Sequence, residues 1–252
     1  MSSSQSTWLP APQQLTLAND EVHVWQAKLD RTVFYVQELL NILDSDEQVR
    51  AQRFRFRKDR EHFIVAHGLL RVILSRYLHE NPHTLRFSYN PYGKPALAEG
   101  YSDHTLSFNL SHASGLVLYA ITCGRRIGID LERIELNLVN EQIAEQFFSP
   151  RETATLHSLP PHLRQEAFFN CWTRKEAYLK AIGEGLSTPL NQCEVTLVPG
   201  EPARLLRSVG NQQDVTAWSL HAFTPCPGYT AALAVEGRDW QLRYWQWTEE
   251  EK

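Results

Sequence analysis

Two short segments of this chain hold the residues that could do chemistry. Asp130 and Glu132 are two residues apart in a sequence typical of a strand, so both would point to the same side of it. Glu176 and Lys180 are four residues apart in a sequence typical of a helix, so both would lie on one stripe. Brought together, the two segments would supply three carboxylates and one ammonium, the groups that hold Mg²⁺ against a phosphate.

Each pair also has a plainer interpretation. The acidic pair would be a solvated strand face if Ile127, Ile129 and Leu131 formed the buried face. The helical pair would be a surface salt bridge worth roughly 0.2–0.5 kcal/mol. Two adjacent carboxylates repel each other, however, and a bound cation would relieve that repulsion. Trp172 and its apolar neighbours further indicate that this part of the helix is partly buried.

Helical patterns predict the elements that position these residues. A helix is expected over 63–78, before the stop signal Asn81-Pro82, and another over about 163–182, ended by Gly183. Asp44 or Ser45 is expected to cap an earlier helix. Ser149, Pro150 and Glu152 have the spacing of a capping box. Alternating or apolar runs predict strands at 21–25, 85–89, 106–110, 116–121, 126–132, 194–198, 217–223 and 229–235.

The order helix, Gly/Pro break and paired strands occurs twice along the chain. Residues 108–120 match residues 221–233 in pattern, although not in identity. This weak repeat predicts two α/β halves that meet near residue 124, with a cleft between them. The expected division is an irregular lead-in over 1–20, an N-terminal subdomain over 21–124 and a C-terminal subdomain over 125–252.

Composition indicates a soluble globular protein that binds neither membrane nor nucleic acid. Of 252 residues, 42% are hydrophobic and 21% charged, and no apolar run is long enough to span a bilayer. The N-terminus has no basic and apolar secretion signal, and the net charge of −4 argues against nucleic acid. The cysteines are scattered without a Cys-x-x-Cys pair, which predicts a reducing cytoplasm. They are Cys123, Cys171, Cys193 and Cys226.

Positive charge is concentrated in residues 50–60, where six of eleven residues are basic. Such a run suits a polyphosphate ligand. It would also suit a solvated helix face with ion pairs to Asp59 and Glu61, and the run by itself favours this plainer interpretation.

Two turn-like segments could likewise either bind an anion or be ordinary turns. Ser111 and His112 could bind phosphate or could simply close a turn before Gly115. The segment Tyr92-Gly93-Lys94-Pro95 is an ordinary turn by composition, in which Gly93 would let a planar group approach the backbone while Lys94 reaches an anion. Gly183-x-Gly185 is not a dinucleotide fingerprint, because it follows a helix and lacks a third glycine.

Five motifs stand in a fixed order along residues 50–190, and their series resembles the 4′-phosphopantetheinyl transferase superfamily. The resemblance is to its longer, surfactin-type (Sfp-type) branch, including the cyanobacterial form. That branch is a pseudo-dimer in one chain, which agrees with the internal repeat. The motifs are Tyr92-Gly-Lys-Pro95, Phe108-Asn-Leu-Ser-His112, Gly128-Ile-Asp-Leu-Glu132, Phe147-Phe-Ser-Pro-x-Glu152 and Trp172-Thr-Arg-Lys-Glu-Ala-Tyr-Leu-Lys180.

The resemblance implies a fold and a reaction. The fold would be α+β, a pseudo-twofold pair of similar subdomains, each a small antiparallel sheet packed with a long helix. A monomer would bind coenzyme A in the cleft, mainly through its N-terminal half. With Mg²⁺ it would move the phosphopantetheine arm to a serine of an apo acyl or peptidyl carrier protein, releasing adenosine 3′,5′-bisphosphate. Phosphoryl transfer chiefly requires positioning and neutralisation of charge on oxygen, which these residue types supply.

The resemblance also implies roles for individual residues. Asp130, Glu132 and Glu176 would be the metal ligands, and Glu176, or a water it orients, the base for the carrier serine. Lys180 would steady the α-phosphate and the leaving group. The remaining coenzyme A contacts would be His112 at the phosphates, Ser111, Tyr92, Gly93, Lys94 and Pro95 around the adenosine, and Arg50, Arg53 or Arg57 at the 3′-phosphate.

Two other classes of protein would use similar residues. A non-catalytic module that binds coenzyme A or a carrier would be expected to lose one acidic position, and all three are present. A metal-dependent phosphohydrolase or nuclease would need no acceptor serine, and the acidic net charge disfavours a nuclease.

Leu131 between the acidic positions adds no third ligand from the strand. Nothing after about residue 190 indicates which carrier is served.

Overall fold

The structure, a computed structural model, describes residues 7–100, 106–134, 141–184, 188–209 and 212–249 and contains one structural unit twice. The first unit comprises β2 (Glu21–Lys28), α3 (Arg57–Leu78), the short hairpin β3 (Phe87–Tyr89) and β4 (Pro95–Leu97), and the hairpin β5 (Leu106–Ala113) and β6 (Leu116–Cys123). The second comprises β7 (Ile127–Arg133), α6 (Pro161–Ile182), the short hairpin β8 (Glu194–Val195) and β9 (Leu205–Arg207), and the hairpin β10 (Trp218–Phe223) and β11 (Tyr229–Glu236).

The two units have the same strand order. In each, the first strand pairs antiparallel with the last strand, which pairs antiparallel with the strand before it: β2-β6-β5 and β7-β11-β10. The predicted similarity of 108–120 and 221–233 corresponds to the hairpins β5–β6 and β10–β11. The α+β, pseudo-twofold fold is therefore confirmed.

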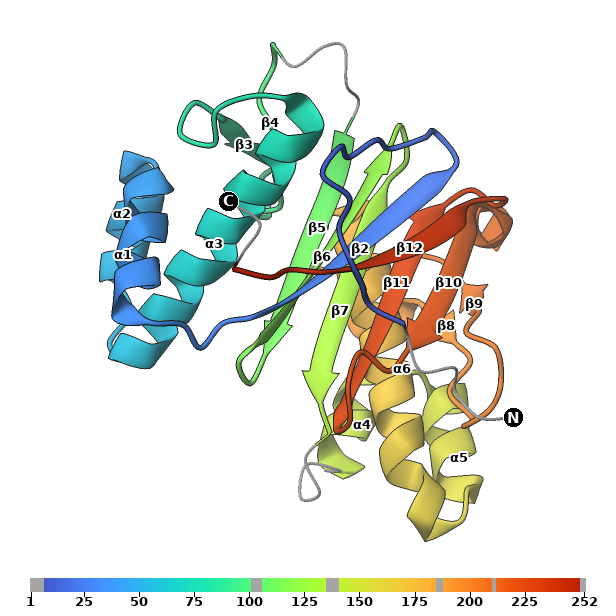
Figure 1. Cartoon of the computed structure of the whole chain (residues 1–252). Helices are drawn as coiled ribbons and strands as arrows, with labels where there is room; N and C mark the ends of the chain where they lie inside the picture. Colours follow the sequence, from blue (N-terminus) through green and yellow to red (C-terminus); the bar gives the residue numbers. More distant parts are fainter. Residues whose placement is uncertain (1–6, 101–105, 135–140, 185–187, 210–211, 250–252) are drawn as a thin grey trace.

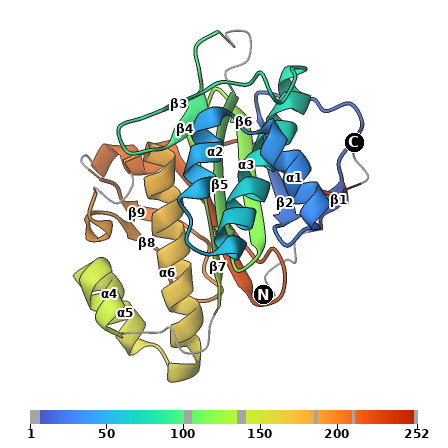
Figure 2. The ribbon, with the colours of Figure 1, turned by 90° about the vertical axis from the view of Figure 1, so that its left-hand side faces the viewer.

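The units pack as four layers: α3, the first sheet, the second sheet and α6 (Figures 1 and 2). Side chains alternate along each strand, so each of the two main sheets can contribute to a core on either side. Val117 and Tyr119 of β6 belong to the core beneath α3, whereas Leu118 and Ala120 belong to the core shared with the second sheet. This central core keeps the two sheets together.

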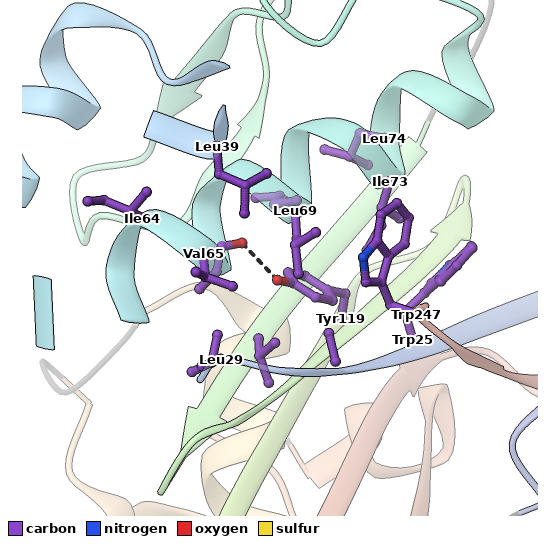
Figure 3. Packing of buried hydrophobic residues seen from close by; sticks show 14 of the residues in the cluster. Trp25, Leu29, Leu39, Ile64, Val65, Leu69, Ile73, Leu74, Tyr119 and Trp247 are labelled. Carbon is purple, nitrogen blue, oxygen red and sulfur yellow. Dashed lines mark hydrogen bonds between the residues drawn. The ribbon is translucent and has the colours of Figure 1, made fainter. Parts of the chain in front are cut away.

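The core beneath α3 is dense and largely apolar (Figure 3). Trp25, Leu69 and Tyr119 are fully buried in it, and each large apolar side chain buried in this way contributes about 1.5–3 kcal/mol. The Tyr119 hydroxyl donates a 2.8 Å hydrogen bond to the carbonyl of Ala66. That bond satisfies a polar group that would otherwise be costly to bury, and it fixes α3 on the sheet.

The last strand departs from the expected division of the chain. β12 (Gln241–Gln246) pairs parallel with β2, and β1 (Leu9–Pro10) pairs parallel with β12. The first sheet is thus five-stranded and mixed, not purely antiparallel. Residues 241–246 were expected in the C-terminal subdomain, and residues 1–20 as an irregular lead-in. Leu242 and Tyr244 alternate with Arg243 and pack on the central core, so the strand signal was in the sequence.

The helix termini follow the capping signals. α5 (Pro150–Ser158) begins with the predicted box of Ser149 and Glu152, and Asp44 caps α2 (Ser45–Gln52) through a second box. α6 ends at Gly183, whose φ of 79° favours glycine. α3 begins six residues earlier than expected, at Arg57, so part of the basic run is helical. α1 (Val33–Ile42) and α4 (Glu141–Phe147) were not predicted.

Among the residues described, no helix combines the length and apolar character that crossing a bilayer requires.

Side chains of β5 join the two sheets where β5 runs beside β7. The amide oxygen of Asn109 accepts a 2.8 Å hydrogen bond from the backbone N–H of Ile129, and the hydroxyl of Ser111 accepts one of 3.2 Å from the N–H of Leu131. Asn109 and Ser111 are buried. They hold the backbone on both sides of Asp130, so the position of this carboxylate depends on the other half of the molecule.

We expect the substitution Asn109→Ala to destabilise the protein by about 1–3 kcal/mol, because it leaves the buried N–H of Ile129 without its acceptor. Urea unfolding would measure the loss, and hydrogen exchange would show faster exchange of the Ile129 amide. Ser107→Ala is the matched control, because Ser107 lies two residues earlier on the same face of β5 and is less buried. Equal stability of the two variants would contradict this role of Asn109.

Candidate functional site

β7 and α6 approach each other closely because residue 128 of β7 is a glycine and has no side chain. Gly128, Asp130 and Glu132 share the face of β7 that α6 covers. A Cβ atom at Gly128 would lie 2.1 Å from the carbonyl oxygen of Ala177 and 2.4 Å from the backbone nitrogen of Ala181. No other residue type fits there, so α6 approaches β7 more closely than side chains normally permit. This contact brings Glu176 and Lys180 to the acidic pair.

Asp130 is the centre of the polar contacts at this site. The Lys180 ammonium lies 2.6 Å from Asp130 Oδ1 and 2.9 Å from the hydroxyl of Ser111, and that hydroxyl lies 3.2 Å from the same Asp130 oxygen. The Ser111 hydroxyl can donate to Asp130 while accepting from Lys180 and from the backbone. Lys180, from the second unit, and Ser111, from the first, therefore meet at one carboxylate oxygen.

The other two carboxylates, Glu132 and Glu176, are harder to ionise than ordinary carboxylates. Burial, followed by repulsion from Asp130, raises the pKa of Glu132 to about 7, although a hydrogen bond with Trp172 opposes the shift. Burial and repulsion from Asp130 also raise the pKa of Glu176. Asp130 Oδ2 and Glu176 Oε1 are buried without any hydrogen-bond partner. Two buried oxygens without donors are costly and indicate that a positive group belongs here.

The donor set fits a hard divalent cation. All three acidic side chains offer oxygen, which Mg²⁺ prefers, and the two unpartnered oxygens are free to coordinate. Among the described residues, no three His, Cys, Asp or Glu side chains are already gathered as a metal site. The ammonium of Lys180 supplies the counter-charge to Asp130 instead. Metal ligation would therefore need these side chains to rearrange.

Three histidines lie on the side of the site formed by the first unit. His112 is exposed on β5, at the end next to Ser111. Its partial desolvation lowers its pKa, and the charges of His67, Lys180 and His62 lower it further. A neutral His112 can donate and accept hydrogen bonds at neutral pH. Of these three, only His112 was predicted from the sequence. His67 lies on the helix predicted over 63–78, and His62 lies one residue before that helix.

The three candidate arginines have different environments. Arg50 packs over the rings of Phe63 and Tyr89, and donates a 3.1 Å hydrogen bond to the Tyr89 hydroxyl. Arg53 is exposed at the end of α2, and Arg57 is exposed at the start of α3. Arg57 pairs with Glu61 at 2.7 Å, one of the ion pairs expected for a solvated helix face. Only Arg50 of the three is held by aromatic side chains.

The segment Tyr92–Pro95 joins the two units, which the sequence did not indicate. The Lys94 ammonium donates to the carbonyls of Ile127 and Ala181, at 2.9 and 3.1 Å. Burial lowers the pKa of Lys94 to about 8. Lys94 thus ties the start of β7 to the end of α6 and would have to leave both carbonyls to reach an anion. Tyr92 is exposed, and open space surrounds Gly93, whose φ is 83°.

Trp172 supports the acidic site from the helix. Its ring stacks on Phe168 with centroids 6.1 Å apart and meets Phe147 edge-on at 5.6 Å. The hydrogen bond between Trp172 and Glu132 adds a link from α6 to β7. The sequence predicted the packing role of Trp172, and the bond to Glu132 is an addition from the structure.

The raised pKa of Glu132 predicts how stability depends on pH without metal. The pKa of about 7 in the folded state exceeds the ordinary value of 4.5, so the folded protein holds the Glu132 proton more tightly than the unfolded chain does. The contribution of this proton to the stability of the fold is therefore complete below about pH 4.5 and is lost as pH rises through 7. In EDTA, Glu132→Gln should therefore be more stable than the wild type at pH 8, by roughly 1–3 kcal/mol, and about equally stable at pH 5. Urea unfolding at both pH values measures this, and a pH-independent difference would refute it.

Comparison with known proteins divides the chain at the same place as its repeat. The model of the 4′-phosphopantetheinyl transferase N-terminal region matches residues 23–124, and that of the 4′-phosphopantetheinyl transferase superfamily matches residues 126–234. Among solved structures, the holo-[acyl-carrier-protein] synthase of Thermotoga maritima covers 44% of this chain and 62% of its own, at 24% identity and a TM-score of 0.34. That likeness is too distant to place residues.

Two bacterial relatives match most of the chain. The 4′-phosphopantetheinyl transferase HetI of Nostoc sp. (strain PCC 7120 / SAG 25.82 / UTEX 2576) is 44% identical over 243 residues, covering 96% of this chain and 99% of HetI. The 4′-phosphopantetheinyl transferase ffp of Bacillus subtilis is 29% identical over 201 residues, covering 80% of this chain and 85% of its own. With both halves matched and a relative this similar along its whole length, the chain belongs to the 4′-phosphopantetheinyl transferase superfamily.

Proposed function

We propose that this protein transfers the 4′-phosphopantetheine arm of coenzyme A to a serine of an apo acyl or peptidyl carrier protein, and that the transfer depends on Mg²⁺. Adenosine 3′,5′-bisphosphate is the other product. The observation that supports this most directly is the meeting of Asp130, Glu176 and Lys180 between β7 and α6, where two carboxylate oxygens lack hydrogen-bond donors. Membership of the transferase superfamily supplies the reaction class.

Asp130, Glu132 and Glu176 are the proposed metal ligands. When bound there, Mg²⁺ would neutralise charge on the pyrophosphate of coenzyme A. The cation would also compensate the repulsion that raises the pKa of Glu132 and Glu176. Without metal, Lys180 supplies the positive charge next to Asp130. With the cation bound, Lys180 would be free to turn to a phosphate.

Glu176 is the proposed base, directly or through a water. It removes the proton from the carrier serine while the serine oxygen forms a bond to the β-phosphorus. The bond from that phosphorus to the bridging oxygen breaks, and adenosine 3′,5′-bisphosphate leaves with that oxygen. In the metal-free protein burial raises the pKa of Glu176, which makes this side chain a stronger base than an ordinary carboxylate.

The remaining residues are proposed to hold the phosphates and the adenosine. Lys180 stabilises the α-phosphate as charge develops on the leaving group, and His112 contributes a hydrogen bond to the phosphates. Ser111 borders the adenosine while it orients Asp130. Both residues of β5 belong to the first unit, so the coenzyme A site would be shared by the two halves.

The first unit is proposed to provide most of the coenzyme A grip. The Tyr92–Pro95 turn would border the adenosine, with the exposed Tyr92 ring and the open backbone at Gly93 as its contacts. Of the arginines, Arg50 is the best candidate for the 3′-phosphate because two aromatic rings orient it, whereas Arg57 is paired with Glu61. One chain contains both units, so we expect a monomer, and we expect it in the cytoplasm.

Replacement of Glu176 by Gln should lower the transfer rate by about 10²-fold or more, because the base is lost while the shape of the side chain is kept. The assay mixes the variant with Mg²⁺, coenzyme A and apo carrier proteins, and weighs the carriers by mass spectrometry. Glu166→Gln on the exposed part of α6 is the matched control and should behave as the wild type. Wild-type protein that adds no phosphopantetheine to any of several carriers would sink the proposed function.

Removal of divalent metal should abolish transfer, and added Mg²⁺ should restore it. In Asp130→Asn the Mg²⁺ concentration needed for half-maximal rate should rise by about tenfold or more, since a ligand charge is lost. A readout without turnover is the melting temperature, which Mg²⁺ should raise in the wild type more than in the variant. Full activity after exhaustive chelation would rule out a metal-dependent reaction.

A further inference from the structure

A cavity between the N-terminal half of α6 and the second sheet lies apart from the acidic site. Its volume is about 740 Å³, in the range of pockets that hold a small molecule. Residues of α6 between 162 and 174 form one wall, β10 and the start of β11 form another, and residues 200–203 form a third. These elements lie on the side of the molecule away from α3 (Figure 1). None of the four residues of the acidic site lines the cavity.

Small side chains of the sheet leave this space open. Ala222, Ala232 and Asp130 lie opposite one another on β10, β11 and β7, so Ala222 points toward α6 as Asp130 does. Ala222 and Thr230 are the residues that the sheet presents to the cavity on this row and the next. The backbone of α6 touches β7 only farther along the helix, at Gly128. The helix therefore covers the cavity without filling it.

Arg174 is the charged group buried in the wall of this cavity. The residue is only 3% exposed. Its Nη1 donates hydrogen bonds of 2.6 and 3.1 Å to the carbonyl and the hydroxyl of Thr196. Its Nε is buried without a partner, and no carboxylate among the described residues forms an ion pair with it. A buried guanidinium without a counter-charge is costly, so it indicates that an anion belongs in the cavity.

Thr196 holds the guanidinium of Arg174 in a fixed orientation. The Thr196 hydroxyl donates a 2.8 Å hydrogen bond to the carbonyl of Pro202 and accepts one of 2.9 Å from the backbone N–H of Arg204. Within the part of the chain that the structure describes, Arg174 donates only from Nη1. The edge that carries Nε and Nη2 is left for a ligand, and its two parallel N–H groups match the two oxygens of a carboxylate.

The other residues of the cavity limit what the rest of the ligand can be. Phe169 and Leu220 supply apolar surface. Glu166 and Glu201 also line the cavity and are exposed, and their charges act on Arg174, whose pKa of about 10 leaves it charged at neutral pH. Two negative charges repel a doubly charged phosphate more than a singly charged carboxylate. The cavity therefore suits a monocarboxylate with an apolar body.

We propose that the cavity between α6 and β10 binds a small monocarboxylate through Arg174. The carboxylate accepts hydrogen bonds from Nε and Nη2 of the guanidinium, and its apolar body packs on Phe169 and Leu220. This binding is separate from that of coenzyme A and does not depend on the proposed transfer to a carrier. Thr230 lines the cavity and pairs with Glu132, so the ligand would lie one strand away from the acidic strand.

Hexanoate and phenylacetate are the probes, and hexanamide and phenylacetamide are their uncharged counterparts. Saturation-transfer NMR titrations at neutral pH measure the dissociation constants without turnover. Each acid should bind about tenfold or more tightly than its amide, because hydrogen bonds to a charged group are the stronger ones. Phenyl phosphate, which is largely doubly charged at that pH, should bind more weakly than phenylacetate.

Arg174→Gln should weaken the binding of both acids by about tenfold or more and leave the binding of the amides unchanged. Arg164→Gln is the matched control. Arg164 also belongs to α6 and donates to the backbone carbonyls of Leu159 and His157, but it does not line the cavity. The control should bind the acids as the wild type does.

A second variant tests the cavity without changing Arg174. Ala222→Leu adds three carbon atoms from β10 on the side that faces α6, so it should abolish the binding of both acids and both amides. Melting curves establish that each variant is folded. If Arg174→Gln does not fold, the comparison of Ala222→Leu with the wild type decides.

Four results would overturn the carboxylate site. Equal affinities of the acids and their amides would remove the role of the charge. Unchanged binding of the acids by a folded Arg174→Gln or by Ala222→Leu would place the ligand elsewhere. Displacement of the acids by coenzyme A with Mg²⁺ would place them at the acidic site. Tighter binding of phenyl phosphate than of phenylacetate would contradict the class of ligand.

Discussion

The close contact between α6 and β7 at Gly128 is the constraint on which the site depends. The helix carries Glu176 and Lys180, the strand carries Asp130 and Glu132, and the proposed reaction needs side chains from both elements. A side chain at Gly128 would collide with the backbone of α6 at Ala177 and Ala181, so the helix would be pushed away from the strand. Separation by even an ångström would matter, because phosphoryl transfer depends on positioning.

A buried ion pair fixes the rotation of the same helix. Lys175, next to Glu176, is fully buried, where its ammonium pairs with Glu152 and donates a 2.7 Å hydrogen bond to the carbonyl of Cys193. Glu152 also accepts a hydrogen bond from the backbone N–H of Val195, at 2.8 Å. Losing one partner of such a pair commonly costs about 3–5 kcal/mol, because it strands a buried charge. Lys175 thus points into the core while Glu176 points at β7.

The duplicated fold explains why the site is shared between distant parts of the chain. Each unit alone offers an outer helix on a three-stranded antiparallel sheet, and the inner faces of the two sheets form the central core. At the β5–β7 junction, Ser111 from the first unit orients Asp130 in the second. Lys94 likewise reaches from the first unit to the carbonyls of β7 and α6. The two halves are therefore tied together at the place where the acidic residues lie.

The sequence by itself determined the elements whose signals are local. The spacing of Asp130 and Glu132, the helical stripe of Glu176 and Lys180, and the capping box at Ser149 all depend on residues only a few positions apart, and all were predicted. Tertiary structure decided what these local patterns touch. Four kinds of contact join residues about 20 to more than 200 positions apart. They are the hydrogen bonds of Asn109 and of Lys94, the pairing of β12 with β2, and the ion pair of the capping residue Glu152 with Lys175. No periodic pattern in the sequence predicts such contacts, because they are set by how the two units pack.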